Sequence, residues 1–136
     1  MLLNDKVALV TGAGRGIGRG IAVAFAAQGC KVACAARTAS EVDETVRLIG
    51  EAGGEALALT CDGTNSVDVH EAVECTLEAW GRIDLLVNNA GYADFKPFIE
   101  MSMDDWHRTM DVNLASVVLF TQAVLPAMRS QGGGRI

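Results

Sequence analysis

The sequence has little of what marks several large classes of protein. Its cysteines form no CxxC pair and its histidines lie at no metal-ligand spacing from them, so we expect reduced, structural thiols and no metal site. No basic cluster offsets the net charge of −6, which argues against a general nucleic-acid surface. With no apolar run long enough to span a membrane and no signal peptide, we expect a cytoplasmic protein without a membrane partner. The residues concerned are Cys30, Cys34, Cys61, Cys75, His70 and His107.

What is present is a regular alternation of two patterns. Half of the 136 residues are hydrophobic (50%), enough for one domain with a real core. Short apolar runs rich in small and β-branched residues predict strands that are buried on both faces. Longer segments between them have helical period. The predicted strands are residues 7–10, 31–36, 56–61 and 83–87.

The helical segments carry apolar faces and start signals. In the first, Ile17, Ile21 and Phe25 recur every four residues and predict the buried face. The second is predicted to begin at Ser40, which forms a capping box with Asp43, and to end at residues 53–54.

The last helical region is the longest. A third helix is predicted from residue 66 to a terminator at residue 81. A looser segment, 92–101, then precedes a second capping pair, Ser102 and Asp105. The helix that follows runs to about residue 129, with a break near Asp111 and a bend at Pro126.

Strands alternating with helices predict a doubly wound α/β fold, a parallel sheet with right-handed crossovers. We find no internal repeat and no linker, so residues 1–136 are interpreted as a single domain. Arg135 and Ile136 resemble the first step of a fifth strand, so the domain is expected to be incomplete.

A glycine-rich turn joins the first strand to the first helix, from Thr11 to Gly18. Neither the GxGxxG spacing nor a phosphate-binding P-loop fits, but TGxxxGxG does. Glycines there let a pyrophosphate approach the free N–H groups and positive dipole end of a helix. The alternative is a glycine-rich turn without a ligand. The predicted cofactor-binding residues of this turn are Gly12, Arg15, Gly16, Ile17 and Gly18.

In this turn and in four later motifs the chain resembles the short-chain dehydrogenase/reductase family, from Lys6 to its end, including members of the 3-oxoacyl-[acyl-carrier-protein] reductase type. The resemblance implies a Rossmann-type fold and a dinucleotide-binding domain. It also implies an oxidoreductase that transfers a hydride between a nicotinamide cofactor and a small carbonyl compound or secondary alcohol.

The end of the second strand bears on cofactor choice. An NAD enzyme usually places an acid there for the ribose hydroxyls, whereas this chain has Ala36 and Arg37, followed by Thr38. A guanidinium suits a 2′-phosphate, and the resemblance assigns Arg15 the same preference. We therefore expect NADP(H) to be favoured over NAD(H), although either arginine alone could be a solvated surface residue.

The resemblance assigns further contacts on the adenosine side. Asp62, after the third strand, is expected to contact the adenine ring, with a plain helix-entry aspartate as the alternative. Asn89, Ala90 and Gly91, which follow Asn88, are expected to line the cofactor and stabilise the sheet. A structural turn would also use Asn and Gly.

Asn113 stands within the long helical region, where asparagine is a poor helix former because it competes for backbone hydrogen bonds. The resemblance makes it the catalytic-site asparagine that interrupts this helix, its backbone carbonyl holding a water in a proton relay. Val112 beside it is expected to contact the cofactor. A solvent-facing asparagine is the alternative.

The family's catalytic serine, tyrosine and lysine are expected beyond Ile136. Tyr92 and Lys96 match YxxxK literally, but they directly follow the Asn-Asn-Ala-Gly motif and precede Pro97, where a helix is disfavoured. We therefore expect the chain alone to be inactive and to belong to a longer, homo-oligomeric enzyme. The alternatives are a non-catalytic dinucleotide-binding module and one half of a split assembly.

Overall fold

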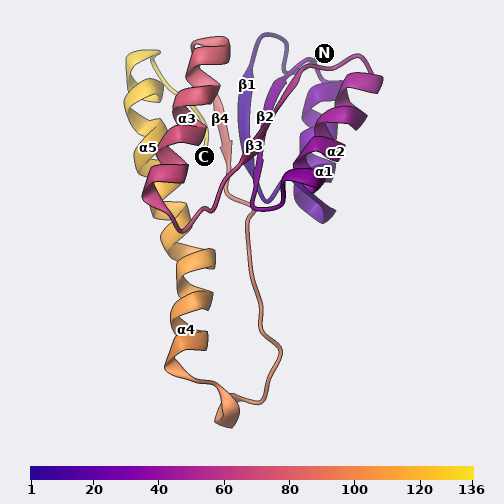
Figure 1. The fold of residues 1–136 in the computed structure, drawn as a ribbon. Helices are drawn as coiled ribbons and strands as arrows, with labels where there is room; N and C mark the ends of the chain where they lie inside the picture. Colours follow the sequence, from indigo (N-terminus) through magenta and orange to yellow (C-terminus); the bar gives the residue numbers. More distant parts are fainter.

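The computed structural model describes residues 1–136 and contains one parallel four-stranded sheet. The strand order is β3-β2-β1-β4, so the chain adds strands first on one side of β1 and then on the other (Figure 1). This confirms the doubly wound α/β fold. The strands are β1 (Val7–Thr11), β2 (Lys31–Ala36), β3 (Ala56–Thr60) and β4 (Leu85–Val87), each within two residues of its predicted limits.

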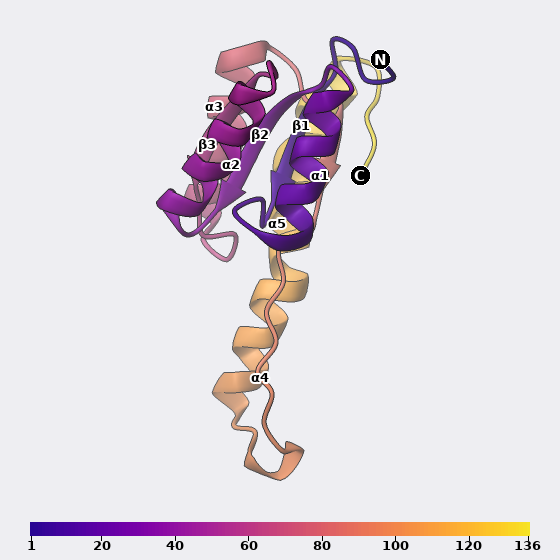
Figure 2. The same cartoon turned by 90° about the vertical axis from the view of Figure 1, so that its right-hand side faces the viewer.

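Two pairs of helices enclose this sheet. Helices α1 (Gly16–Ala27) and α2 (Ala39–Glu51) cover one face, and α3 (Ser66–Trp80) and α5 (Ser116–Ser130) cover the other (Figure 1). The segment after β4, with the 3-10 helix Phe98–Glu100 and helix α4 (Met103–Met110), projects away from the body of the domain (Figure 2).

The core lies on both faces of the central strands, as the continuous apolar runs predicted. Leu9 of β1 packs with Phe120 and Val124 of α5, while its neighbours Ala8 and Val10 point to the opposite face. All of these side chains are nearly inaccessible to solvent. The two central strands therefore hold the two helical layers together.

The predicted buried face of α1 is wrong at one position. Ile17 is 78% exposed, and the fully buried residues of this helix are Gly18, Ala22 and Ala26. The small side chains at these positions let the helix approach the sheet closely. They, and not Ile17, therefore form the centre of the face that packs on the sheet. Ile17 is left at the rim of the cavity described below.

Of the two predicted capping boxes, the one at Ser102 is confirmed and the one at Ser40 is wrong. Ser102 and Asp105 form theirs: the Asp105 N–H donates to Ser102 Oγ at 3.1 Å, and the Ser102 N–H donates to Asp105 Oδ2 at 2.8 Å. The box at Ser40 is wrong, because α2 begins at Ala39 with Thr38 as its N-cap and without a side-chain cap. Thr38 has an extended backbone and is the last residue before the helix, so Ser40 already lies inside the first turn.

The long helical region is interrupted where expected. A π-helical turn, Asp111–Ala115, separates α4 from α5 within one continuous helix, Met103–Ser130. The expectation that no segment could span a membrane needs correction here, since this helix is long and apolar enough by length and composition. That is weak support for a span, because Phe120, Val124 and Met128 on one side of it belong to the domain core.

Arg135, where the first step of a fifth strand was predicted, pairs with the sheet through a single bridge. The Arg135 N–H donates to the Asp84 carbonyl at 2.8 Å, and the Leu86 N–H donates to the Arg135 carbonyl at 2.9 Å. Arg135 thus forms a parallel bridge with Leu85 on the side of β4 that does not face β1. Beyond this bridge the outer edge of β4 has no strand partner.

A buried carboxylate joins the amino ends of β1 and β4. Asp84 Oδ2 accepts from the Val7 N–H at 3.0 Å, and Arg82 donates to both carboxylate oxygens at 2.8 and 2.6 Å. Burial by itself would raise the pKa of Asp84, but these hydrogen bonds and the Arg82 and Lys6 charges outweigh it and hold the pKa below its usual range. The carboxylate is therefore charged throughout the neutral range.

We expect Asp84→Asn to lower the free energy of unfolding by about 2 kcal/mol, because the ion pairs are lost at a buried site. Since the folded pKa is depressed, the wild-type contribution is present above the unfolded pKa of about 3.9 and is lost as pH falls below it. Urea unfolding at neutral and acidic pH measures the effect of the substitution and the pH dependence of the wild type. Glu71→Gln, an exposed change on α3, should stay within about 0.5 kcal/mol, and an equal loss there would contradict the assignment.

Candidate functional site

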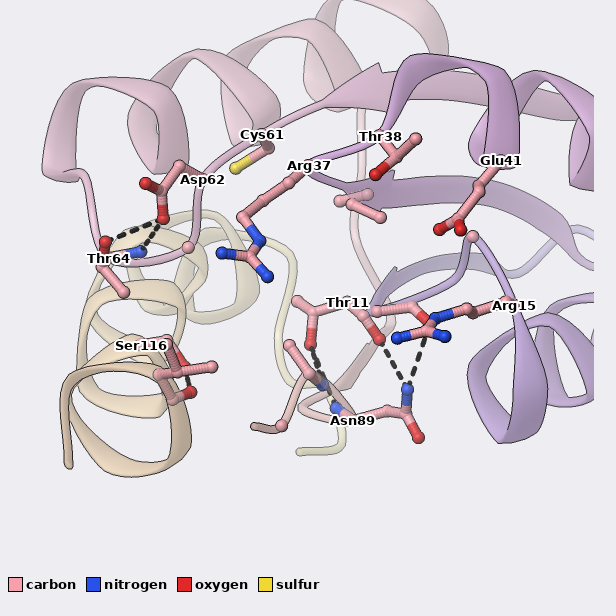
Figure 3. A pocket seen from close by; sticks show the side chains of 18 of the residues that line it. Thr11, Arg15, Arg37, Thr38, Glu41, Cys61, Asp62, Thr64, Asn89 and Ser116 are labelled. Carbon is pink, nitrogen blue, oxygen red and sulfur yellow. Dashed lines mark hydrogen bonds between the residues drawn. The ribbon is translucent and has the colours of Figure 1, made fainter. Parts of the chain in front are cut away.

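A cavity of about 370 Å³ opens at the carboxyl ends of the strands (Figure 3). In open α/β sheets ligands bind at this edge, where the strand order reverses. All predicted cofactor-binding residues except Gly18 line it. The full lining is Thr11, Gly12, Gly14, Arg15, Gly16, Ile17, Ala35, Ala36, Arg37, Thr38, Glu41, Cys61, Asp62, Gly63, Thr64, Asn89, Ala90, Gly91, Val112, Ser116 and Phe120.

The glycine-rich turn brings the start of α1 to this cavity. Gly12 has φ of +64°, and a Cβ there would lie 2.8 Å from Asn89 Nδ2. A Cβ on Gly18 would lie 2.1 Å from the Gly12 carbonyl oxygen, so only glycine permits this contact between helix and strand. The helix has no side-chain cap and no acid in its first turn. Its first N–H groups are therefore available to an anion.

Thr11, which the sequence analysis did not select, ties the turn to β4. Its hydroxyl accepts from the N–H groups of Asn89 and Ala90, both at 3.0 Å. The Asn89 amide in turn donates to the carbonyls of Thr11 at 3.0 Å and Gly12 at 3.3 Å. Asn89 is thus first a sheet-joining residue, and Ala90 and Gly91 continue from it along the cavity wall.

Arg15, Arg37 and Thr38 lie around the cavity as predicted (Figure 3). Neither arginine has a carboxylate within ion-pairing distance in the structure. Both positive charges are therefore uncompensated by protein at close range. Glu41, from the first turn of α2, lines the same cavity and was not selected from the sequence.

Asp62 lies at the cavity opposite the glycine-rich turn (Figure 3). Its Oδ1 accepts from the Thr64 N–H at 2.9 Å and the Thr64 hydroxyl at 2.7 Å. These hydrogen bonds, with a smaller contribution from the Arg37 charge, hold the pKa of Asp62 below its usual range. Thr64 was not selected from the sequence, and its hydrogen bonds fix the position of this carboxylate.

Asn113 does not line the cavity, but it adjoins Val112, which does. Its amide Nδ2 donates to the carbonyls of Tyr92 at 2.7 Å and Thr109 at 2.8 Å, and its Oδ1 accepts from the Tyr92 N–H at 3.2 Å. The side chain therefore holds the segment after β4 against the π-helical turn. The sequence analysis anticipated the helix interruption but not this connection.

The literal YxxxK match is not helical. Residues 92–96 form no regular element, and Lys96 Nζ is paired with Asp105 at 2.8 Å and Asp94 at 3.3 Å. The charge of Lys96 is thus balanced by two carboxylates. One of them, Asp105, also accepts the hydrogen bond from Ser102 that caps α4. The structure supports the rejection of this pair as a catalytic Tyr–Lys unit.

All four cysteines are free, and Cys30, Cys34 and Cys61 are buried. Burial raises the pKa of Cys34 to about 12, and burial assisted by Asp68 and Asp62 raises that of Cys61 to about 12. Cys61 lines the cavity, but a thiol with so high a pKa is a poor nucleophile. No cluster of side chains suited to a metal ion occurs in the described chain.

A parallel sheet, an uncapped helix start behind a glycine-rich turn and a cavity at the strand ends define a Rossmann-type α/β domain. The model of the family described as short chain dehydrogenase matches residues 6–136. The chain belongs to this family of oxidoreductases.

Individual relatives agree with that assignment. A 3-oxoacyl-[acyl-carrier-protein] reductase of Synechocystis sp. is 42% identical over 98% of this chain and 55% of its own length. A 7alpha-hydroxysteroid dehydrogenase of Escherichia coli (strain K12) is 38% identical over 98% of this chain and 52% of its own. The crystal structure of a metagenomic short-chain oxidoreductase in complex with NADP superposes with a TM-score of 0.93 at 38% identity, over 98% of this chain and 61% of that one. The chain thus spans about half the length of the curated relatives it matches.

We expect Gly18→Ala to lower the free energy of unfolding by about 2 kcal/mol or more, because the new methyl group collides with the Gly12 carbonyl. Gly20→Ala is the matched control, since a Cβ at Gly20 in the same helix meets nothing within 4 Å. That change should raise stability by about 0.5–1 kcal/mol. Urea unfolding followed by far-UV circular dichroism measures both, and equal effects would refute the close contact.

Proposed function

We propose that residues 1–136 are the cofactor-binding domain of a cytoplasmic oxidoreductase. It transfers a hydride between NADP(H), in preference to NAD(H), and a small carbonyl compound or secondary alcohol. The observation that carries the proposal is the cavity at the strand ends, where an uncapped helix start lies with two unpaired arginines. The NADP-bound neighbour and the family membership support it.

The residues present fit a dinucleotide. The free N–H groups at the start of α1, with Gly12, Gly16 and Ile17, would hold the pyrophosphate, and Gly18 allows the close approach of helix and strand. Asp62 would contact the adenine ring as a charged acceptor. Ala90 and Gly91, which keep the wall of the cavity close to the backbone, would line the rest of the cofactor together with Asn89 and Val112.

The cofactor preference would come from charge. Arg15 and Arg37 would bind the 2′-phosphate with multi-donor guanidinium groups, and the Thr38 hydroxyl would supply a further donor. A ribose without the phosphate gains little from two cations.

The residues at the cavity are not sufficient for the proposed reaction, which needs a proton exchange besides the hydride transfer. The bound cofactor provides the hydride, while this chain binds and orients it. No tyrosine and lysine meet at the cavity, so we propose that the proton-exchanging groups lie in a further part of the protein. Asn113 would contribute through its backbone carbonyl at the π-helical turn, in a proton relay held in place by its side-chain contacts with Tyr92.

Uncovered apolar surface supports a larger assembly. Trp106, Leu114, Val118 and Leu125 of the long helix are 41–54% exposed. The outer edge of β4 is paired only at Arg135. A further part of the protein would pair with this edge, and a second copy would cover the helix, giving a homo-oligomer. The same open edge is what a split assembly of two chains would use.

Titration with NADPH and NADH, followed by fluorescence and thermal shift, tests the proposal. We expect tighter binding of NADPH, and Arg37→Ala should weaken NADPH about tenfold while leaving NADH within about twofold. Arg47→Ala removes the same charge from α2 outside the cavity and should preserve the preference. A folded chain that binds neither cofactor would defeat the proposal.

The chain by itself should bind NADPH without oxidising it in the presence of small ketones, because no tyrosine or lysine that could exchange the proton lines the cavity. Loss of NADPH absorbance over time measures turnover. Sustained turnover that survives Tyr92→Phe and Lys96→Ala would show that another group in this chain performs the proton transfer.

A further inference from the structure

Glu41 places a second carboxylate, besides Asp62, in the cavity that Arg15 and Arg37 also line. Its carboxylate reaches into the pocket between Thr38 and Arg15 (Figure 3), and Arg37 lines the same pocket. It forms no ion pair with either arginine. A site built only for a phosphate would not be expected to keep an unpaired carboxylate there, because like charges repel.

We propose that Glu41 is a specificity-determining residue for the cofactor. This inference rests on the proposed function. The carboxylate opposes the 2′-phosphate of NADP(H) and accepts a hydrogen bond from the free ribose hydroxyl of NAD(H). The two arginines and Glu41 together set a moderate preference, so that the protein binds both cofactors.

The position of Glu41 is fixed by close contact with the glycine-rich turn. A Cβ on Gly14 would lie 2.9 Å from Glu41 Cβ and 3.1 Å from its carboxylate oxygen Oε2. Gly14 is thus required to be small because Glu41 is packed against it. The first turn of α2 and the turn that receives the pyrophosphate are neighbours at this point.

Two further side chains hold these segments together. Arg19 Nη2 donates to the carbonyl of Gly14 and, at 3.2 Å, to that of Glu41. Arg19 Nε donates to the hydroxyl of Thr45 at 3.0 Å, and that hydroxyl donates to the Ala13 carbonyl at 2.8 Å. Thr45 is completely buried, so its hydrogen bond to the Ala13 carbonyl is shielded from water, while Arg19 is half-buried. The backbone of Glu41 therefore keeps its place relative to the turn, which limits its carboxylate to the part of the cavity near Gly14.

The test uses the full-length protein that contains these residues, titrated by calorimetry with NADPH, NADH, adenosine 2′,5′-bisphosphate and ADP. Glu41→Gln removes the charge at nearly constant shape. We expect it to tighten NADPH and the bisphosphate about fivefold at low salt and less at high salt, with NADH and ADP unchanged or weaker. Glu41→Ala, which also removes the acceptor, should weaken NADH about threefold.

Asp43→Asn is the matched control. It makes the same change of charge in the same helix, but Asp43 is exposed and lies outside the cavity. We expect its ratio of NADH to NADPH dissociation constants to equal that of the wild type. A thermal unfolding transition for each variant confirms that it is folded.

The outcomes separate the two proposals. If the wild type prefers NADPH but Glu41→Gln leaves the ratio unchanged, or changes it no more than Asp43→Asn does, the role of Glu41 is overturned and the proposed function stands. If the folded wild type binds neither cofactor, both are overturned. A ratio that rises only in the Glu41 variants supports the inference.

Discussion

The contact between the start of α1 and the end of β1 is the constraint on which the rest of this structure depends. Gly18 lies so close to the Gly12 carbonyl that no side chain fits, and the Asn89 amide occupies the same space from β4. The Thr11 hydroxyl completes the junction by accepting hydrogen bonds from the N–H groups of Asn89 and Ala90, which follow β4. These contacts therefore set the position of the helix, align the carboxyl ends of β1 and β4, and leave the helix N–H groups facing the cavity.

Charge is arranged around that junction in a graded way. The helix start and two arginines attract anions, whereas Glu41 and Asp62 add negative charge to the same cavity. Hydrogen bonds from Thr64 stabilise the Asp62 carboxylate, and contact with Gly14 limits where Glu41 can lie. Electrostatic interactions are stronger in a cavity than on an open surface, because the dielectric constant is lower and the charges lie close together. Cofactor choice is therefore interpreted as a balance of charges on several elements.

The other end of the domain is held by different forces. Asp84 joins the amino ends of β1 and β4 through buried, charge-assisted hydrogen bonds. On the far side of β4, however, a single bridge at Arg135 is all that pairs with the strand. The long helix also exposes apolar side chains. An edge and a surface of this kind favour association with further polypeptide. This agrees with a chain that spans about half the length of its curated relatives.

The sequence by itself determined the strands, the order of helices and the place of the glycine-rich turn, because apolar periodicity and glycine spacing are local properties that folding keeps. It also identified the break near Asp111 and the cap at Ser102. The tertiary structure was needed to show that Ile17 lies at the cavity and that α2 begins at Ala39. It also showed that Thr11, Thr64 and Glu41 line the cavity and that Arg19 holds the backbone of Glu41. Most of these depend on contacts between segments far apart in the chain, such as the 22 residues that separate Arg19 from Glu41. Such contacts leave no periodic signal, so they could be known only once the sheet had brought its carboxyl ends together.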